Sequence, residues 1–319
     1  MTKNWFATAL RFATCRIAPL ALALALMAGC GGSSSNNSNN RNTVQAVPAA
    51  DHVFLVVLEN HSFSQVIGSP AMPYLNSLAS QHALAASYFA NTHPSIGNYF
   101  MLTVGNMETN SDAFSGTISD DNIVRALTQA GKSWKAYIEN LPSVGYTGGD
   151  VPPLYLKQHN PFSYLSDVLN SSTQAANMAP FSQFSADLAS GNLANFVYIA
   201  PNSQNDAHDC PGGAASCADT DRLAAADTWL KNNIDPLVQS PNFGNSLLII
   251  TWDESVNTDA ANGGGQVATV LVGPHTRSAF RSTMTHQHQD TLRTILQALQ
   301  VSDLPNAAKS ANTLGDMLQ

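Results

Sequence analysis

The sequence predicts an α/β fold in which helices flank a mostly parallel central sheet, and two observations support this expectation. The first is a set of apolar runs bounded by polar residues, at 53–58, 196–200, 246–252 and 267–272. Such runs are typical of buried strands, more often parallel than antiparallel. The second is a set of helix-like patterns between them, at 121–130, 219–234 and 290–299. Strands that alternate with helices are typical of a layered α/β domain.

Polar pairs follow two of the predicted strands at the point where each strand ends. The first run closes on Glu59 and Asn60, and the third closes on Asp253 and Glu254. Ligands of open α/β sheets gather at the carboxyl edge of the strands. Three carboxylates placed together there would repel one another unless a cation neutralised them. A single pair would more simply cap a helix or face solvent, but two pairs in matching positions favour a divalent-metal site.

A loop from Asn91 to Tyr99 places Ser95 before an apolar stretch and has the features of a nucleophile turn. A serine at a helix start lies beside backbone N–H groups that attract an anion. A neighbouring cation would lower the pKa of its hydroxyl. The simpler alternative is that Ser95 only caps the helix.

Two further segments carry histidines in positions of interest. The loop that follows the strand predicted at 196–200 brings Asn205, Asp206, His208 and Asp209 within five positions, which is dense for a mere turn. His286 and His288 precede the last predicted helix. A helix start lowers the pKa of a histidine and keeps its ring neutral, able to bind metal or transfer a proton. A lone histidine there would more often be a surface residue.

The first 29 residues have the layout of a secretory signal peptide: basic residues precede an apolar run at 18–28, and no acidic residue occurs. The small residues before Cys30 resemble a lipobox, which predicts cleavage after residue 29 and lipidation of Cys30. A plain signal peptide or an uncleaved anchor is the alternative. The apolar run is too short for a bilayer-spanning helix, which needs about 20 residues. We expect an exported protein, lipid-anchored in the cell envelope (periplasm or outer membrane) or at the cell surface.

Residues 30–43 are almost entirely Gly, Ser and Asn, a composition typical of a flexible tether, so we expect the catalytic domain to span 44–319. Three of the 14 basic residues and none of the 22 acidic ones precede Cys30, so the mature chain has a net charge of −11. This charge excludes nucleic acid as an expected partner. In an oxidising compartment Cys210 and Cys217 most simply form a disulfide, and a metal pair is the less favoured alternative.

Seven ordered motifs together resemble the phosphoesterase family, which includes acid phosphatases and bacterial phospholipases C. They cover nearly the whole predicted domain: ENHSF at 59–63, THPSIGNY at 92–99, SWKAYIENLP at 133–142, KQHNPF at 157–162, PNSQNDAHDC at 201–210, TWDES at 251–255 and HQDTLRTI at 288–295. The resemblance implies an alkaline-phosphatase-like fold. It also implies a serine or threonine nucleophile beside a metal that acidic residues hold.

The resemblance assigns roles to individual residues. It implies that Ser95 is the nucleophile and that His208 and His288 act at the phosphoryl oxygens or the leaving group. The implied ligands of a divalent metal ion are Glu59, Asn60, Ser95, Asp253 and Glu254. Substrate-binding positions in matching motifs are His93, Asn98, His159, Asn160 and Asp206. Gly97 replaces a proline usual in the family and Gln266 replaces a frequent histidine; the second departure favours one bound ion over two.

These residues predict a metal-dependent phosphoric-ester hydrolase that forms a phosphoseryl intermediate. The favoured function is acid phosphatase, acting on small phosphate monoesters. A phospholipase C-type phosphodiesterase, acting on phospholipids, is the alternative, because loops around a common centre set specificity. A further alternative is a lipoprotein that binds a phosphoryl ligand or glycan without turnover. A sulfatase is excluded because no Cys-x-Pro-x-Arg sequence is present.

Overall fold

The computed structural model describes residues 46–319. The predicted signal peptide, the lipidation site at Cys30 and the tether lie outside the described residues, and so remain predictions. Within the described part, no helix is long and apolar enough to cross a membrane.

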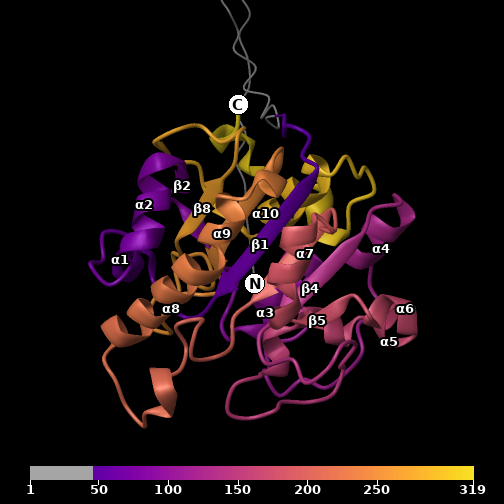
Figure 1. Cartoon of the computed structure of the whole chain (residues 1–319), viewed down its shortest axis with the longest axis horizontal. Helices are drawn as coiled ribbons and strands as arrows, with labels where there is room; N and C mark the ends of the chain where they lie inside the picture. The colour runs from indigo at the N-terminus through magenta and orange to yellow at the C-terminus, as the bar shows by residue number, and fades with distance from the viewer. Residues whose placement is uncertain (1–45) are drawn as a thin grey trace, which may run out of the picture. The chain divides into compact units, whose positions relative to one another are not determined.

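An eight-stranded sheet forms the centre of the fold (Figure 1). Its strands are β1 (His52–Leu58), β2 (Ala83–Ala85), β4 (Trp134–Ile138), β5 (Met178–Pro180), β6 (Phe196–Ala200), β7 (Ser246–Trp252), β8 (Thr269–Val272) and β9 (Phe280–Ser282). Their order across the sheet is β5-β4-β6-β1-β7-β8-β2-β9. The central strands β1, β6 and β7 are completely or almost completely buried, as their continuous apolar sequences predict.

Pairing within this sheet is mostly parallel, which confirms the predicted fold class. β1 pairs in parallel with both β6 and β7, and β4 with both β5 and β6. The fourth run, predicted as a parallel strand from 267, differs from this expectation. The strand β8 begins at Thr269 and is antiparallel to both β7 and β2. The connection from β7 to β8 contains no helix. An antiparallel neighbour needs no crossover, whereas a parallel strand would need a long one, usually helical.

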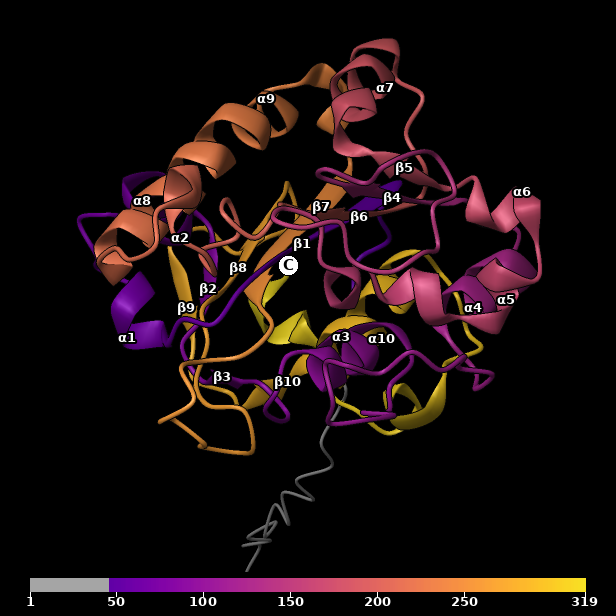
Figure 2. The same ribbon diagram turned by 90° about the horizontal axis from the view of Figure 1, so that it is seen from below.

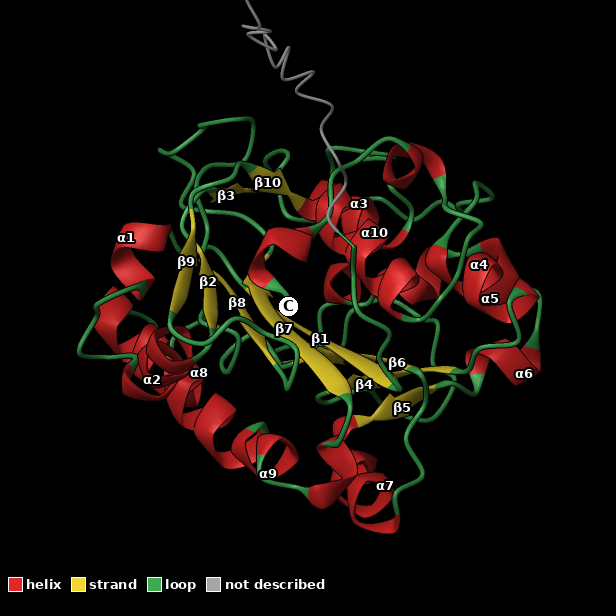
Figure 3. Ribbon diagram, turned by 90° about the horizontal axis from the view of Figure 1, so that it is seen from above, coloured by secondary structure: helices red, strands yellow, loops and turns green. Residues whose placement is uncertain are grey.

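Helices cover both faces of the sheet. They are α1 (Phe63–Val66), α2 (Pro73–Gln81), α3 (Ile96–Thr103), α4 (Ile123–Gln129), α5 (Ser166–Leu169), α6 (Ser172–Ala175), α7 (Phe184–Ser190), α8 (Asp219–Asn233), α9 (Asp235–Val238) and α10 (His288–Ala298). Figures 2 and 3 show α2, α7, α8 and α9 on one face and α3, α4 and α10 on the other. On the first face, Asp227 of α8 accepts the N–H groups of Tyr74 and Leu75 at 2.9 Å and so caps the start of α2.

The predicted helices are present with shifted ends. The helix expected from 121 begins at Ile123, because the side chain of Asn122 accepts the N–H of Arg125 and caps it. The last helix starts two residues before the predicted 290, after a capping box in which Asp290 accepts the N–H of Gln287. His288 therefore lies in the first turn of α10 rather than before the helix.

The register of β1 and β7 brings the two polar pairs together. Leu58 is the partner of Trp252, so Glu59 and Asp253 leave the sheet side by side. The N–H of Asp253 donates to the carbonyl of Leu58 at 2.9 Å, and the N–H of Glu59 donates to that of Asp206 at 2.8 Å. A small parallel sheet of β3 (Tyr88–Phe89) and β10 (His286–Gln287) holds the start of the Ser95 loop beside α10.

Candidate active site

Ser95 is the N-cap residue of α3, but its hydroxyl does not cap the helix. The Oγ atom donates to Glu59 Oε2 at 3.1 Å and lies 3.4 Å from both Asn60 Oδ1 and Glu254 Oε1. A serine used only as a cap would direct this oxygen to the N–H groups of its own helix. The hydroxyl instead faces the acidic cluster, as the nucleophile prediction requires.

The predicted metal ligands form one buried cluster of oxygens. Glu59 and Asp253 are fully buried, and Glu254 is 2% exposed. Asn60 joins them through its N–H, which donates to Asp253 Oδ1 at 3.3 Å. Asp253 Oδ2 has no hydrogen-bond partner among the described residues.

The side-chain amide of Asn60 can take either of two orientations in this cluster. Its Oδ1 faces carboxylate oxygens, whereas the opposite orientation would let its nitrogen donate to Glu59 and Asp253. An inward Oδ1 is the orientation that a cation would favour, because hard divalent ions bind carboxylate, amide and hydroxyl oxygens. No three His, Cys, Asp or Glu side chains of the described chain form a ready-made metal site. The three carboxylates alone therefore do not make such a site, and a cation here would also need the amide oxygen of Asn60 and the hydroxyl of Ser95.

Burial disfavours the charged forms of all three acids, and repulsion by neighbouring carboxylates adds to it at Glu59 and Glu254. Burial, followed by the charges of Asp253 and Asp206, raises the pKa of Glu59 well above its usual value. The same causes, burial first and then Asp253 and Asp112, raise the pKa of Glu254 to about 9. Burial raises the pKa of Asp253 to about 7, against the hydrogen bond from the backbone N–H of Asn60. A divalent cation on these oxygens would stabilise the charged forms.

His93 and Asn98 brace the Ser95 loop. Nδ1 of His93 lies 2.8 Å from Glu254 Oε2, and Nε2 donates to the carbonyl of Asp259 at 3.0 Å. Asn98 is fully buried, accepts the N–H groups of Asn91 and Thr92, and donates to the Thr92 carbonyl at 2.9 Å. Asn98 therefore holds the backbone of the loop that leads to Ser95, whereas a contact with substrate was predicted for it.

A glycine segment packs directly against the same loop. Gly264 donates to the carbonyl of Ala90 at 3.1 Å, and Ala90 donates to that of Gly265 at 2.9 Å. A Cβ on Gly263 would lie 2.0 Å from the Asn91 carbonyl oxygen, and one on Gly264 would lie 2.4 Å from that of Thr92. Only glycine allows this approach. Gln266 follows the segment and donates its side-chain amide to the carbonyl of Ala86 at 2.8 Å, so it braces the chain here.

His159 links the Asp206 loop to the reaction centre. Its Nε2 lies 3.1 Å from Glu59 Oε1 and its Nδ1 lies 3.1 Å from Asp206 Oδ2. The ring stacks on Tyr99, whose hydroxyl donates to Glu59. Asn160, by contrast, is buried against Tyr155 and Met178, so the structure does not bring this predicted substrate-binding residue to the cluster.

His208 lies at the rim of the centre. Its backbone N–H donates to Asp206 Oδ1 at 2.8 Å, and its Nδ1 is 2.9 Å from Asp209 Oδ1. Its side chain is 37% exposed. It lines a recess of about 240 Å³ whose wall also includes Asn60. A half-exposed ring beside the metal-ligand cluster is suited to proton transfer.

His288 is placed differently from the prediction. It is fully buried, with Nε2 donating to the carbonyl of Asp253 at 2.6 Å and Nδ1 3.0 Å from the hydroxyl of Tyr88. Burial, against the hydrogen bond to Asp253, lowers its pKa to about 4. Both ring nitrogens are occupied within the protein. The geometry therefore corrects the expectation that His288 faces the phosphoryl group: it positions Asp253 from behind.

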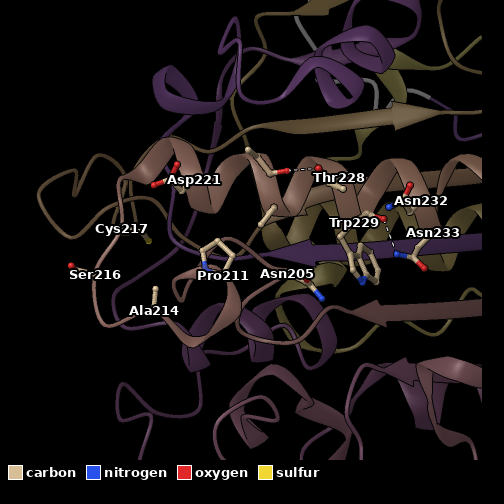
Figure 4. Close-up of a pocket in the computed structure, with 12 residues that line it drawn as sticks. Asn205, Pro211, Ala214, Ser216, Cys217, Asp221, Thr228, Trp229, Asn232 and Asn233 are labelled. Carbon is tan, nitrogen blue, oxygen red and sulfur yellow. Dashed lines mark hydrogen bonds between the residues drawn. The ribbon is translucent and has the colours of Figure 1, made fainter.

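The predicted disulfide is present, joining Cys210 and Cys217. A hollow of about 770 Å³ lies between its loop and α8 (Figure 4). Trp229, Asn232 and Asn233 of α8 line one side, and Asn205 lies opposite. None of the predicted catalytic or metal-binding residues lines this hollow.

Comparison with known proteins decides the family. A model of the phosphoesterase family matches residues 69–302. The chain belongs to the phosphoesterase family. It is 31% identical over 272 residues to phosphatidylinositol-3-phosphatase of Mycobacterium tuberculosis, covering 84% of this chain and 82% of that protein. It is 29% identical to a probable acid phosphatase of Kluyveromyces lactis, covering 69% of this chain but only 50% of that protein. This phosphoesterase is a phosphoric-ester hydrolase.

Solved structures confirm the fold. A protein of the alkaline phosphatase superfamily from Vibrio parahaemolyticus aligns with a TM-score of 0.58 at 12% identity, covering 83% of this chain and 72% of that one. A phosphonate monoester hydrolase from Silicibacter pomeroyi aligns with a TM-score of 0.56 at 13% identity, covering 84% and 76%. The phosphoesterase thus has the predicted alkaline-phosphatase-like fold.

Two residues of the centre escaped sequence reasoning. Tyr99 lies four positions after Ser95, one helical turn on, and this spacing was a usable signal that both face the same way. Asp112 accepts the N–H of Ile96, in the first turn of α3, at 3.1 Å. It is 17 positions from Ser95 in an irregular segment, and nothing in the sequence marks it.

Proposed function

We propose that this phosphoesterase is a metal-dependent acid phosphatase that forms a phosphoseryl intermediate on Ser95. The observation that carries the proposal is the position of Ser95 Oγ, at the start of α3 and within 3.4 Å of Glu59, Asn60 and Glu254 oxygens. The names of the relatives, a phosphatidylinositol-3-phosphatase and acid phosphatases, support a phosphomonoester as substrate.

The residues that would hold the ion are Glu59, Asn60, Ser95, Asp253 and Glu254. One divalent cation there would polarise the phosphoryl oxygens and lower the pKa of the serine hydroxyl. We expect one ion per site because Gln266, which stands where relatives often have a histidine, donates to a backbone carbonyl instead.

The chain's own groups carry two displacements. Ser95 Oγ attacks phosphorus as an alkoxide, the bond from phosphorus to the leaving oxygen breaks, and His208 transfers a proton to that oxygen. Water then attacks the phosphoseryl group and gives a proton to His208, and the serine oxygen leaves as the alkoxide again. The positive end of the α3 dipole would stabilise the equatorial oxygens. His93, His159 and Tyr99 hold the acids in place through the contacts described above.

Location is part of the proposal. The signal-like segment 1–29 and the lipobox-like residues before Cys30 support export and anchoring of the enzyme by a lipid in the cell envelope. The substrate would then be a phosphate ester outside the cytoplasm, either soluble or in a membrane.

The deciding assay compares hydrolysis of p-nitrophenyl phosphate and p-nitrophenyl phosphorylcholine by the purified chain from pH 4 to 9, before and after chelation. We expect metal-dependent preference for the monoester. Preference for the diester would replace the phosphatase by a phospholipase C-type enzyme.

The nucleophile has a matched test. Ser95→Ala should lower kcat by about 10³-fold or more while the fold survives. Ser246→Ala removes another buried serine, at the opposite end of β7 from Asp253, and should keep full activity. Retention of more than a few per cent of activity in Ser95→Ala would exclude the phosphoseryl mechanism.

A further inference from the structure

The recess beside the reaction centre contains groups that the reaction above does not use. Its wall includes Asn60 and His208, which tie it to the centre, and also His61 and Arg222. Asn60 Oδ1 is 3.4 Å from Ser95 Oγ, so one residue of the recess wall contacts the proposed nucleophile. The alcohol half of a phosphate ester bound at Ser95 must lie in a neighbouring space. This recess is such a space, because Asn60 and His208 belong to both.

Arg222 carries a fixed positive charge into this recess. It lies on the first turns of α8, where Nη1 donates to Asp219 Oδ1 at 2.8 Å and Nη2 lies 3.7 Å from Cys210 Sγ. Its Nε is buried without a hydrogen-bond partner among the described residues. A guanidinium has five N–H groups. The contacts within the protein therefore leave donors available, and the side chain is 28% exposed.

His61 lies on the same wall, and one of its two ring nitrogens forms no hydrogen bond within the described chain. The residue is 3% exposed, and its Nδ1 lies 3.2 Å from the carbonyl oxygen of Glu59, which only accepts. Nδ1 therefore donates, and Nε2 on the other side of the ring has no partner within the described chain. Nε2 is itself buried, so His61 shapes the wall of the recess without offering this atom to a ligand.

Asp219 also lines the recess and forms an ion pair with Arg222. Its carboxylate accepts from Arg222 and also from Gln65 Nε2 at 3.3 Å. Both bonds hold the guanidinium on the wall of the recess, and the remaining donors keep the planar geometry that suits carboxylate and phosphate groups. In a mature chain predicted to carry excess negative charge, this is an unusual place for a positively charged group.

We propose that the recess recognises a second anionic group, a carboxylate or phosphate, on the alcohol half of the phosphate ester. Arg222 donates to that anion, and His61 forms part of the wall beside it. This inference rests on the proposed phosphatase activity and narrows it to acidic leaving groups.

The test uses carboxyphenyl phosphates, with the carboxylate ortho, meta or para, and their neutral carbamoyl analogues. For the best isomer, kcat/KM should exceed that of its amide by about tenfold, the value of one charged hydrogen bond. Arg222→Gln should abolish this preference while leaving the amide within about twofold, since only the charged contact is lost. Arg222→Lys should retain part of it. Lys231→Gln is the control, because Lys231 lies on the same helix but pairs with Asp235 away from the recess. This change should leave the preference for the carboxylate unaltered.

The outcomes separate the two proposals. If neither member of any pair is hydrolysed, the phosphatase proposal fails. If both are hydrolysed but no carboxylate isomer is preferred, or the preference survives Arg222→Gln, the anion subsite is refuted. An Arg222→Gln chain that no longer folds would lose activity on the amide too, and Arg222→Lys then decides by keeping or losing the preference.

Discussion

Two groups of buried carboxylates in this enzyme differ in whether a positively charged side chain lies between the acids. At the reaction centre, Glu59, Asp253 and Glu254 lie together with raised pKa values. Near the C-terminus, His286 lies between Asp290 Oδ2 at 3.3 Å and Asp316 Oδ1 at 3.1 Å, and Ser282 donates to Asp316. The second group contains a cation of its own, His286, and the first does not. Buried acids without internal compensation mark where a ligand belongs, and compensated ones mark structure.

The largest effect should come from neutralising one acid of the uncompensated centre. Glu59→Gln should lower kcat/KM by about 10³-fold, because it removes a ligand oxygen and the acceptor of the Ser95 hydroxyl. In chelator, the same change should raise the Tm, since it relieves repulsion between buried acids. Steady-state kinetics and thermal unfolding measure the two effects. A variant that is both active and less stable would contradict the comparison.

Breaking the compensated group should have the opposite result. His286→Gln leaves two buried carboxylates without their cation and should cost about 3–5 kcal/mol of unfolding free energy. Activity per folded molecule should stay within about twofold in this variant, because His286 does not contact the reaction centre. Urea unfolding gives the stability, and kcat at low denaturant gives the activity. His275→Gln, which loses one exposed bond to Asn245, is the control.

Adding a divalent cation should stabilise the chain by supplying the missing charge at the centre. At 100 times the Kd the gain is about 2.7 kcal/mol. Titration of the chelated chain with Mg²⁺, Mn²⁺, Ca²⁺ or Zn²⁺, followed by thermal unfolding, measures it. The rise in Tm on adding metal should be smaller in Glu59→Gln and unchanged in His286→Gln. An equal gain in Glu59→Gln would place the ion elsewhere.

The compensated group also predicts a pH dependence of stability. Burial lowers the pKa of His286, but the hydrogen bonds to Asp290 and Asp316 outweigh it and raise the pKa to about 9. A histidine whose pKa is raised on folding contributes stability that is complete below about 6.5 and lost as the pH rises through 9. Stability should fall by at most about 1.4 kcal/mol per pH unit in that window. Urea midpoints of His286→Gln should lack this slope.

The smallest effect concerns Asp112, whose carboxylate accepts the N–H of Ile96. This negative charge competes with a phosphoryl group for the start of α3. Asp112→Asn should lower KM for p-nitrophenyl phosphate by about two- to fivefold with little change in kcat, as expected for about 0.3–1 kcal/mol at a helix terminus. A higher KM would show that Asp112 helps to bind substrate.

The sequence predicted the central strands well because they are buried on both faces and so are continuously apolar. β6 and β7 match their predicted spans, and β1 differs by one residue. β4 was missed because Lys135 interrupts its apolar pattern, and its ion pair with Asp187 at 2.6 Å depends on tertiary structure. The short strands β2 and β9 have three residues each, too few for any periodicity.

At the site, position at strand ends predicted that Glu59, Asn60, Asp253 and Glu254 lie close together, and they do lie beside Ser95. Their roles as metal ligands, and that of Ser95 as nucleophile, are proposals. The direction of individual side chains was harder to predict. His288 and Asn98 lie in the expected motifs but turn toward backbone carbonyls and N–H groups, and local sequence does not encode that choice. Arg222, which we propose as the anion contact, was not predicted, because α8 reaches the recess only through folding, from more than 120 positions beyond Ser95.

The glycine segment at 263–265 has a consequence for how this enzyme tolerates sequence change. A side chain at Gly263 or Gly264 would displace the backbone of Asn91 and Thr92, which leads directly to Ser95. In a saturation-mutagenesis screen scored by turnover, these positions should be as intolerant as the nucleophile itself, although neither touches substrate. Inactivating hits alone would thus overstate the size of the active site, and any evolutionary route to new specificity must vary the walls of the recess while leaving this contact intact.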